Sequence, residues 1–517
     1  MKRLLFFCIF SFSLIFLPVH VAGQDGRPLR MEIPVKDDSE IYKVVPCSEN
    51  GLVIIYLSSE TDENGNIVWI MAMLDKELKE KWRKSFPLQR GFSLQEALYS
   101  NGHLILFMHS AKGSAEGNFR VVDLLTESGE FFIAGYTIPE RSGISYFSIG
   151  NEFAVAGVNL RNDESQILAY NFKNRQISVI SPGVPGSAAV VSLNIDKNSN
   201  KITAVIRTSG SGKKRNFYFV KTDLTGNIYT NLQLSKFDDD RLINTAFSYS
   251  VDATTDMVIG SYGRSSRTRT VEGIETIGIA STGFFSILIK NNEETNSNFY
   301  EFTSFENFYR YLRRPADISS ARRTSNRIER GKEYSVNHDL LTHEVFKWKD
   351  QYVFLAEAYY PEYRTVTTMV YDYYGRPYPS TYSVFEGFRY LTTFVAGFDG
   401  NGNLIWNNDL ELRSILSQTL KPRVLAREDP EGLVLAYISE GKIISKLING
   451  AQTIEAISQS DIAPLSSRDR VFNDSNSIIE HWYNSYFVAY GYQNIRNSYV
   501  SGRSNKNVFY INKVAYY

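Results

Sequence analysis

Short apolar runs recur along the chain, and each one follows a polar turn. Five of the seven steps between the starts of successive runs lie near 50 residues, at 52, 49, 49, 55 and 54, and the other two are 95 and 81. Runs of this length between turn residues predict β-strands, and a fixed period predicts a repeated unit. The sequence therefore predicts eight units. The apolar run that marks each unit, its marker strand, begins near Leu52, Leu104, Phe153, Ile202, Met257, Tyr352, Leu433 and Phe487.

A second repeated feature is a turn in which an Asp precedes Gly and Asn, and an aromatic residue opens the next strand. Its fullest copies run from Asp399 to Trp406 and from Asp62 to Trp69; Asp75 and Trp82 keep the same spacing, and the segment from Asp223 to Tyr229 keeps the turn. Gly and Asn both tolerate positive φ, so the pair suits a tight hairpin, and the Asp can bond turn amides. We expect the aromatic residue to pack between neighbouring sheets. The predicted structural turn residues are Asp223, Gly226, Asn227, Asp399, Gly402, Asn403 and Trp406.

Each unit accommodates four short strands, with this turn between the third and the fourth. A four-stranded sheet cannot bury both faces alone, whereas radial stacking gives it a partner on each side. The repeats of a β-solenoid, the main alternative, are usually shorter. The sequence thus predicts an all-β protein, a single β-propeller of eight four-stranded blades. The last unit ends with a third strand at 508–517, and we expect residues 30–35 to supply its fourth strand and close the ring.

The N-terminus has the pattern of an export signal. Lys2 and Arg3 precede an apolar segment, and small residues at 21–23 offer a cleavage site, so we assign 1–23 to a signal peptide and 24–517 to the propeller. Retention of the signal as an anchor is the alternative, and no later stretch approaches the length of a membrane span. The 56 basic residues balance the 56 acidic ones, which gives no reason to expect a nucleic-acid partner.

The strings from Asp399 to Trp406 and from Asp62 to Trp69 resemble the tryptophan-docking repeat of quinoprotein-like eight-bladed β-propellers. In that repeat an Asp precedes a Thr-Gly turn and a Trp that docks on the next blade; here the loop is one residue shorter. The family contains quinone-dependent dehydrogenases and non-catalytic scaffolds such as the outer-membrane-assembly propeller lipoprotein. The resemblance disfavours the dehydrogenases, because their adjacent-cysteine disulfide cannot form with Cys47, the one thiol left after cleavage. It implies the scaffold branch, although the lipid-attachment site is missing.

No catalytic or metal-binding constellation stands out in the sequence. His338 and His343 lack the Glu placement of a helical zinc motif, and we interpret the histidines as surface or turn residues. The repeated turn also resembles the Asp-box of sialidases, at a different spacing. A glycan-binding or carbohydrate-active, glycosidase-like propeller is therefore the alternative function, and it would require two carboxylates about 5–10 Å apart. We assign no catalytic residue, no metal and no cofactor, and an enzyme is the less favoured interpretation.

The two long steps contain insertions that a plain blade does not need. The first, at about 304–332, has a basic excess that suits a protein surface, an acidic glycan or a lipid headgroup, with a solvated loop as the alternative. The second, at about 359–390, is rich in Tyr, whose large apolar face and polar tip favour binding surfaces; capping the propeller channel is the alternative. The candidate partner-binding residues are Arg310, Arg313, Arg314, Arg322, Arg323, Arg327, Tyr359, Tyr360, Tyr363, Tyr371, Tyr373, Tyr374 and Tyr378.

Together these features predict a non-catalytic, exported propeller. We expect a protein-interaction scaffold, or an accessory or plug subunit, with a protein partner in a bacterial-type cell envelope. The last predicted strand reaches Tyr517 and leaves no room for a sorting domain, so a periplasmic location is favoured over an extracellular one.

Overall fold

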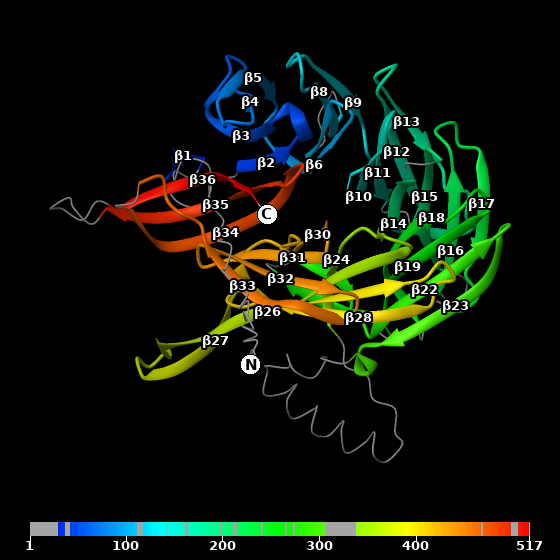
Figure 1. Ribbon diagram of the computed structural model, residues 1–517. Helices are drawn as coiled ribbons and strands as arrows, with labels where there is room; N and C mark the ends of the chain where they lie inside the picture. Colours follow the sequence, from blue (N-terminus) through cyan, green and yellow to red (C-terminus); the bar gives the residue numbers. More distant parts are fainter. Residues whose placement is uncertain are drawn as a thin grey trace, which may run out of the picture.

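Eight antiparallel sheets follow one another around a ring in the computed structural model, seven of them four-stranded and one with two short strands added to a four-stranded path (Figure 1). The structure describes residues 29–36, 42–110, 117–140, 142–160, 164–196, 199–209, 215–238, 241–263, 266–271, 274–305, 338–466, 469–497 and 505–515. The fold is therefore an eight-bladed β-propeller, as predicted. Each of the eight predicted marker strands is the second strand of its blade.

The first four blades are regular four-stranded units. Blade 1 contains β2 (Tyr42–Pro46), β3 (Leu52–Thr61), β4 (Ile67–Leu74) and β5 (Glu80–Leu88). Blade 2 contains β6 (Phe92–Ser100), β7 (His103–Ser110), β8 (Phe119–Leu125) and β9 (Phe131–Tyr136). Blade 3 contains β10 (Gly143–Ile149), β11 (Phe153–Asn159), β12 (Ser165–Asn171) and β13 (Gln176–Ile180). Blade 4 contains β14 (Ser187–Asp196), β15 (Lys201–Ser209), β16 (Arg215–Thr222) and β17 (Ile228–Gln233).

Blades 5 and 6 carry additional strands, and blade 8 takes its fourth strand from the N-terminal part of the chain. Blade 5 contains β18 (Leu242–Ser250), β19 (Thr255–Gly263), β22 (Gly283–Lys290) and β23 (Glu293–Glu301), with an extra hairpin of β20 (Ser266–Val271) and β21 (Ile274–Ile279). Blade 6 contains β24 (Asp339–Thr342), β25 (Phe346–Trp348), β26 (Gln351–Tyr371), β27 (Pro377–Phe398), β28 (Leu404–Glu411) and β29 (Leu416–Ser417). Blade 7 contains β30 (Leu425–Asp429), β31 (Gly432–Ser439), β32 (Lys442–Asn449) and β33 (Gln452–Asp461). Blade 8 contains β34 (Asp469–Tyr483), β35 (Tyr486–Asn497), β36 (Asn505–Ala515) and β1 (Arg30–Pro34). Two short 3₁₀ turns lie at Ser48–Asn50 and Phe302–Ser304.

The N-terminal strand closes the ring, as predicted. β1 pairs antiparallel with β36, from Arg30 opposite Asn512 to Pro34 opposite Val508, and is the fourth strand of blade 8. The Arg30 guanidinium is fully buried at this seam, where it donates to Gln493 Oε1 at 2.8 Å and to Asn512 Oδ1 at 3.2 Å. The first and last described strands are thus joined by backbone pairing and by a buried side-chain network.

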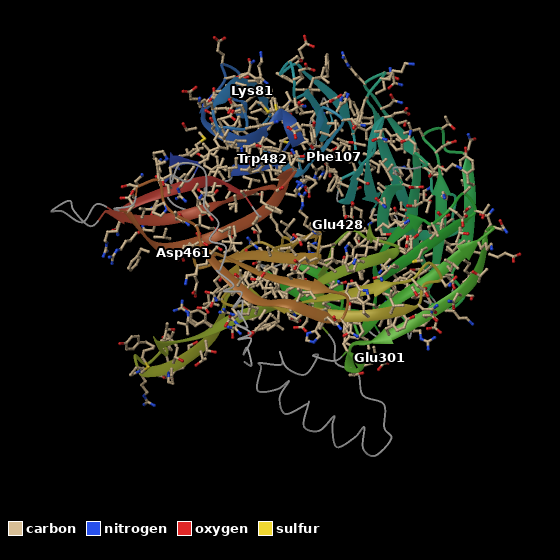
Figure 2. All side chains as sticks on the ribbon, viewed as in Figure 1. Lys81, Phe107, Glu301, Glu428, Asp461 and Trp482 are labelled. Carbon is tan, nitrogen blue, oxygen red and sulfur yellow. The ribbon has the colours of Figure 1, made fainter. Side chains whose placement is uncertain are left out.

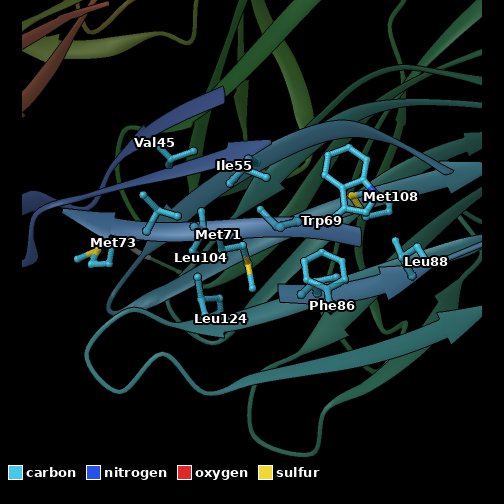
Figure 3. Close-up of a cluster of buried hydrophobic side chains, with 14 of the residues drawn as sticks. Val45, Ile55, Trp69, Met71, Met73, Phe86, Leu88, Leu104, Met108 and Leu124 are labelled. Carbon is cyan, nitrogen blue, oxygen red and sulfur yellow. The ribbon is translucent and has the colours of Figure 1, made fainter. Parts of the chain in front are cut away.

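Apolar side chains between neighbouring sheets form the core. Figure 3 shows one such cluster, in which Trp69, Met71 and Phe86 of blade 1 pack against Leu104 and Met108 of blade 2. The first strands of neighbouring blades touch one another, as β2 does β6 and β30 does β34, so they form the inner ring. A blade therefore buries both faces, as radial stacking requires.

The repeated turn joins the two strands of a β-hairpin. In three copies Gly takes positive φ, at +76° in Gly65, +84° in Gly226 and +79° in Gly402. We expected the Asn of each turn to take positive φ as well. This is wrong, because none of the Asn residues that follow these glycines is in the positive-φ region. Asn403 instead donates from its side chain to Asp399 Oδ2 at 3.0 Å and from its backbone to Oδ1 at 2.8 Å. The turn is a type I turn followed by a Gly bulge.

The turn aromatics pack between blades in two of the copies that join a third strand to a fourth. Trp406 is 8% exposed, and its ring lies against Gly450, in the corresponding turn of blade 7. Trp82 lies against Gly129 of blade 2 and donates from Nε1 to Thr126 O at 3.2 Å. Tyr229, in the third copy, is 46% exposed instead, so this expectation fails there.

Candidate functional site

The Tyr-rich segment 359–390 is a long hairpin in which the second and third strands of blade 6 continue past the ring. β26 and β27 remain paired from Tyr359 opposite Tyr390 to Tyr371 opposite Pro377. Figure 1 shows this hairpin, labelled β27, projecting away from the ring, and Figure 2 shows its side chains standing free of the other blades. The tip repeats the propeller turn, because Asp372 Oδ1 accepts the amides of Tyr374 and Arg376.

The outer part of the hairpin displays its large side chains to solvent. The exposed fraction of the side chains reaches 97% at Tyr373, 80% at Tyr374 and 71% at Tyr371. The other exposed large side chains here are Tyr363, Met369, Tyr378 and Tyr382. An accumulation of exposed aromatic residues on one projection is typical of a surface that another molecule covers.

Charged residues are confined to the base and the tip of the hairpin. The stretches 365–371 and 377–385 contain none. At the base, Arg364 pairs with Glu386 at 3.0 Å, and Arg389 pairs with Glu362. Apart from Pro377 and Pro379, the strands between these ends carry Thr, Val, Tyr, Met, Ser and Phe, residues that suit a strand and give little protection against association.

The base of the hairpin is fixed to the ring. β29 pairs with β27 through Phe388 and Arg389. The Tyr390 hydroxyl donates to Lys421 O at 2.7 Å. Tyr359 and Tyr360 are half-buried here, against the clusters that join blade 6 to blades 7 and 5 respectively. The predicted tyrosines thus separate into two at the base, Tyr359 and Tyr360, and the displayed set further out.

The basic insertion lies outside the described residues from position 306 onward. This holds for all six candidate arginines, Arg310, Arg313, Arg314, Arg322, Arg323 and Arg327. The predicted signal peptide also lies there. Both assignments remain predictions.

A charged cluster on the inner ring is a feature that the sequence did not indicate. Lys43 of blade 1 pairs with Glu96 of blade 2 at 3.4 Å, and the Tyr490 hydroxyl donates to Glu480 Oε1 at 2.7 Å in blade 8. Glu480 is half-buried, and this burial raises the pKa of its carboxyl although Lys43 and Lys421 oppose the shift. Burial likewise lowers the pKa of Lys421. These residues are far apart in sequence and on different strands, so no local motif marks them.

An open depression of about 660 Å³ lies beside the first strands of blades 6 to 8. Phe346, Lys347, Arg427, Glu428 and His481 are among its lining residues. Its charges are mixed, and it contains no constellation of a nucleophile with an oriented base that would indicate a reaction.

The prediction that the histidines occupy surface or turn positions is wrong for one of them. His338 is buried, and its backbone bridges to Ser281, whereas a surface or turn position was expected. His343 Nε2 lies 2.7 Å from the buried carboxylate of Glu357, which also accepts the amides of Arg423 and Val424. This carboxylate ties blade 6 to blade 7 and has a structural explanation.

The described part of the chain contains no group of three or more His, Cys, Asp or Glu residues placed to hold a metal ion. It also contains no helix long and apolar enough to cross a membrane.

Comparisons with known proteins find solved structures of low similarity. No family model matches the chain, and no curated protein sequence matches it. The WD40 domain of SCAP from fission yeast aligns at 9% identity over 94% of this chain and 98% of its own, with a TM-score of 0.37. The β-propeller domain of the Trilobed protease from Pyrococcus furiosus aligns at 9% identity over 70% and 97%, with a TM-score of 0.24. A polysaccharide lyase, the PL25 ulvan lyase, aligns at 10% identity over 80% and 90%, with a TM-score of 0.36. The fold assignment rests on the eight sheets of this chain, because TM-scores this low add no argument.

Proposed function

We propose that this β-propeller is a non-catalytic binding protein that engages a protein partner through the outer part of the β26–β27 hairpin. One observation carries the proposal: the hairpin projects a Tyr-rich ribbon, uncharged between its base and its tip, into solvent from a base fixed to the ring. Tyr supplies a large contact area at a low entropic cost, and it is enriched at protein interfaces.

We place this protein among exported scaffolds of the cell envelope, with a periplasmic location. The signal-like N-terminus motivates export. Trp82 and Trp406, each seated on a turn glycine of the next blade, support kinship with the tryptophan-docking repeat of quinoprotein-like propellers. The non-catalytic branch of those proteins fits a chain whose distinctive feature is a binding surface. Export is tested by fractionation and N-terminal sequencing: a mature chain that starts near Gln24 is expected, and an intact Met1 in the cytoplasm would refute it.

Site-specific photo-crosslinking in the native cell tests the binding surface. A photoreactive residue in place of Tyr373, which is 97% exposed at the tip, should give a discrete protein adduct. The control position is Lys81, which is exposed on the outer strand of blade 1 (Figure 2). An adduct at Tyr373 and none at Lys81 is expected. No adduct at Tyr373, or the same adduct at both positions, would overturn the proposal.

A further inference from the structure

The hairpin is a ribbon with two long edges. Among the described residues, β26 beyond Tyr359 and β27 from Pro377 to Gly387 pair with each other and with no third strand. An unpaired strand edge is a template for another strand, and natural proteins usually protect it with Pro, Lys or a bulge.

Two prolines reveal which backbone groups face outward. Pro377 and Pro379 lie opposite Tyr371 and Met369. Since Pro has no amide hydrogen, an edge strand places the Pro nitrogen on its solvent side. The pairs of Pro377 with Tyr371 and of Pro379 with Met369 are therefore non-hydrogen-bonded pairs of the ladder. In such pairs the N–H and C=O groups of both residues point away from the partner strand. By alternation along β26, Thr367 also directs its backbone groups toward the free edge.

In the outer part of the ribbon, beyond Pro361 of β26, only one of the two edges is therefore blocked. On the β27 side, the two prolines remove donors from the row of outward-facing groups. On the β26 side, the segment from Thr365 to Tyr371 has no Pro, Lys or Arg and no bulge, and its outward-facing groups are intact. This edge can accept an added antiparallel strand.

We propose that the β26 edge pairs antiparallel with the same edge of a second copy of this chain, about a twofold axis at Thr368. This inference rests on the proposed function and names one partner for the hairpin. In this register Thr367 lies opposite Met369 and Thr365 lies opposite Tyr371, so the outward-facing groups of one copy meet those of the other.

Charge complementarity selects a second copy and this register. The axis at Thr368 places Arg364 of each copy opposite Asp372 of the other, on the same face of the sheet. Arg364 is 65% exposed beside Glu386, so it remains accessible to a second carboxylate. An axis moved by one residue to Thr367 would instead place Glu362 opposite Asp372, two like charges.

The pairing would also stabilise the projecting hairpin. A two-stranded ribbon alone is at best marginally stable in water, and adding strands stabilises it. Two copies joined at this edge form a four-stranded sheet. The tip residues Tyr373 and Tyr374 stay outside the paired segment and remain available to an envelope protein.

Sedimentation of the purified chain from residue 24 onward tests the proposal. The wild-type chain should be a dimer. Thr367→Pro removes an outward-facing amide without breaking the pairing of β26 with β27, and it should give a monomer. The matched control is Thr381→Pro, at the residue opposite Thr367 on the β27 edge, which should stay dimeric.

Engineered disulfides test the register. Thr368→Cys places two thiols opposite each other across a non-hydrogen-bonded pair, at about 4.5 Å between Cα atoms, and should give a covalent dimer on oxidation. Thr365→Cys lies opposite Tyr371 and should not, and the native thiol of Cys47 is buried. A monomeric wild type, or a dimer unaffected by Thr367→Pro, would overturn the inference. If such a monomer still gave the adduct at Tyr373, the proposed function would stand without this inference.

Discussion

Replacement of Arg30 by Met should open the ring at its seam. The guanidinium is fully buried, donates to Glu32, Asn512 and Gln493, and lies over the ring of Tyr510 at 4.6 Å. Met fills much of the same volume but donates no hydrogen bond. It therefore leaves two buried amide oxygens without the donors that they have now.

The size of the effect follows from this burial. Removing one partner of a buried charged network typically lowers the free energy of unfolding by about 3–5 kcal/mol, because polar groups remain buried without partners. The matched control is Lys506→Met: Lys506 pairs with the same Glu32 but is 47% exposed. Because Lys506 is exposed, water can replace its ammonium beside Glu32, and we expect a smaller loss than for Arg30→Met.

Urea unfolding followed by tryptophan fluorescence measures both variants. Trp482 reports on the seam between blades 8 and 1, since its Nε1 donates to Gly51 O at 2.8 Å. We expect a clearly lower midpoint at an unchanged slope for Arg30→Met and a near-native midpoint for Lys506→Met. Losses of equal size would show that the buried network does not hold the closure.

Three further outcomes follow from the repeated turn. Trp406→Ala should lower the free energy of unfolding by about 3–5 kcal/mol, whereas Tyr229→Ala at the exposed copy should cost less than about 1 kcal/mol; equal losses in urea unfolding would contradict the docking role. Gly397→Ala should displace the Trp406 ring, because the added Cβ overlaps it, and a red shift of tryptophan emission checks this; native emission at native stability would argue against it. The pKa of Asp399 is lowered, since the donors of Asn403 outweigh the opposing effect of partial burial. Its charged form therefore stabilises the fold above the unfolded pKa near 3.8, and that contribution is lost as the pH falls through the lower folded pKa. Asp399→Asn should flatten the decline in stability below about pH 4, and a decline as steep as in the wild type would rule this out.

The fold was predictable because its signals are local and repeated. The second strand of each blade is a short apolar run after a polar turn, as at Leu104 and Leu433, and both strand and turn can be recognised without knowing their neighbours. The closure was predictable for a different reason: the last unit lacked a fourth strand, and residues 30–35 were a strand without a unit.

Two features, the extra hairpin of blade 5 and the charged cluster on the inner ring, could not be predicted in the same way. The extra hairpin of blade 5, β20 (Ser266–Val271) with β21 (Ile274–Ile279), was missed, because its short strands look locally like blade strands and only pairing distinguishes them. The charged cluster was missed because Lys43, Glu96 and Glu480 come together only when the ring closes. Folding, and not local sequence, creates that proximity.

The β26–β27 hairpin shows why function is best sought where the repeat fails. A blade strand gains stability from neighbours on both sides, so its sequence reports packing. The outer hairpin has no such neighbours among the described residues, and its sequence must be explained by something else. Prolines occupy the β27 edge at Pro377 and Pro379, while the β26 edge from Thr365 to Tyr371 has no protective residue. Protection of one edge but not the other is what a ribbon requires if it must pair on one side without polymerising on the other.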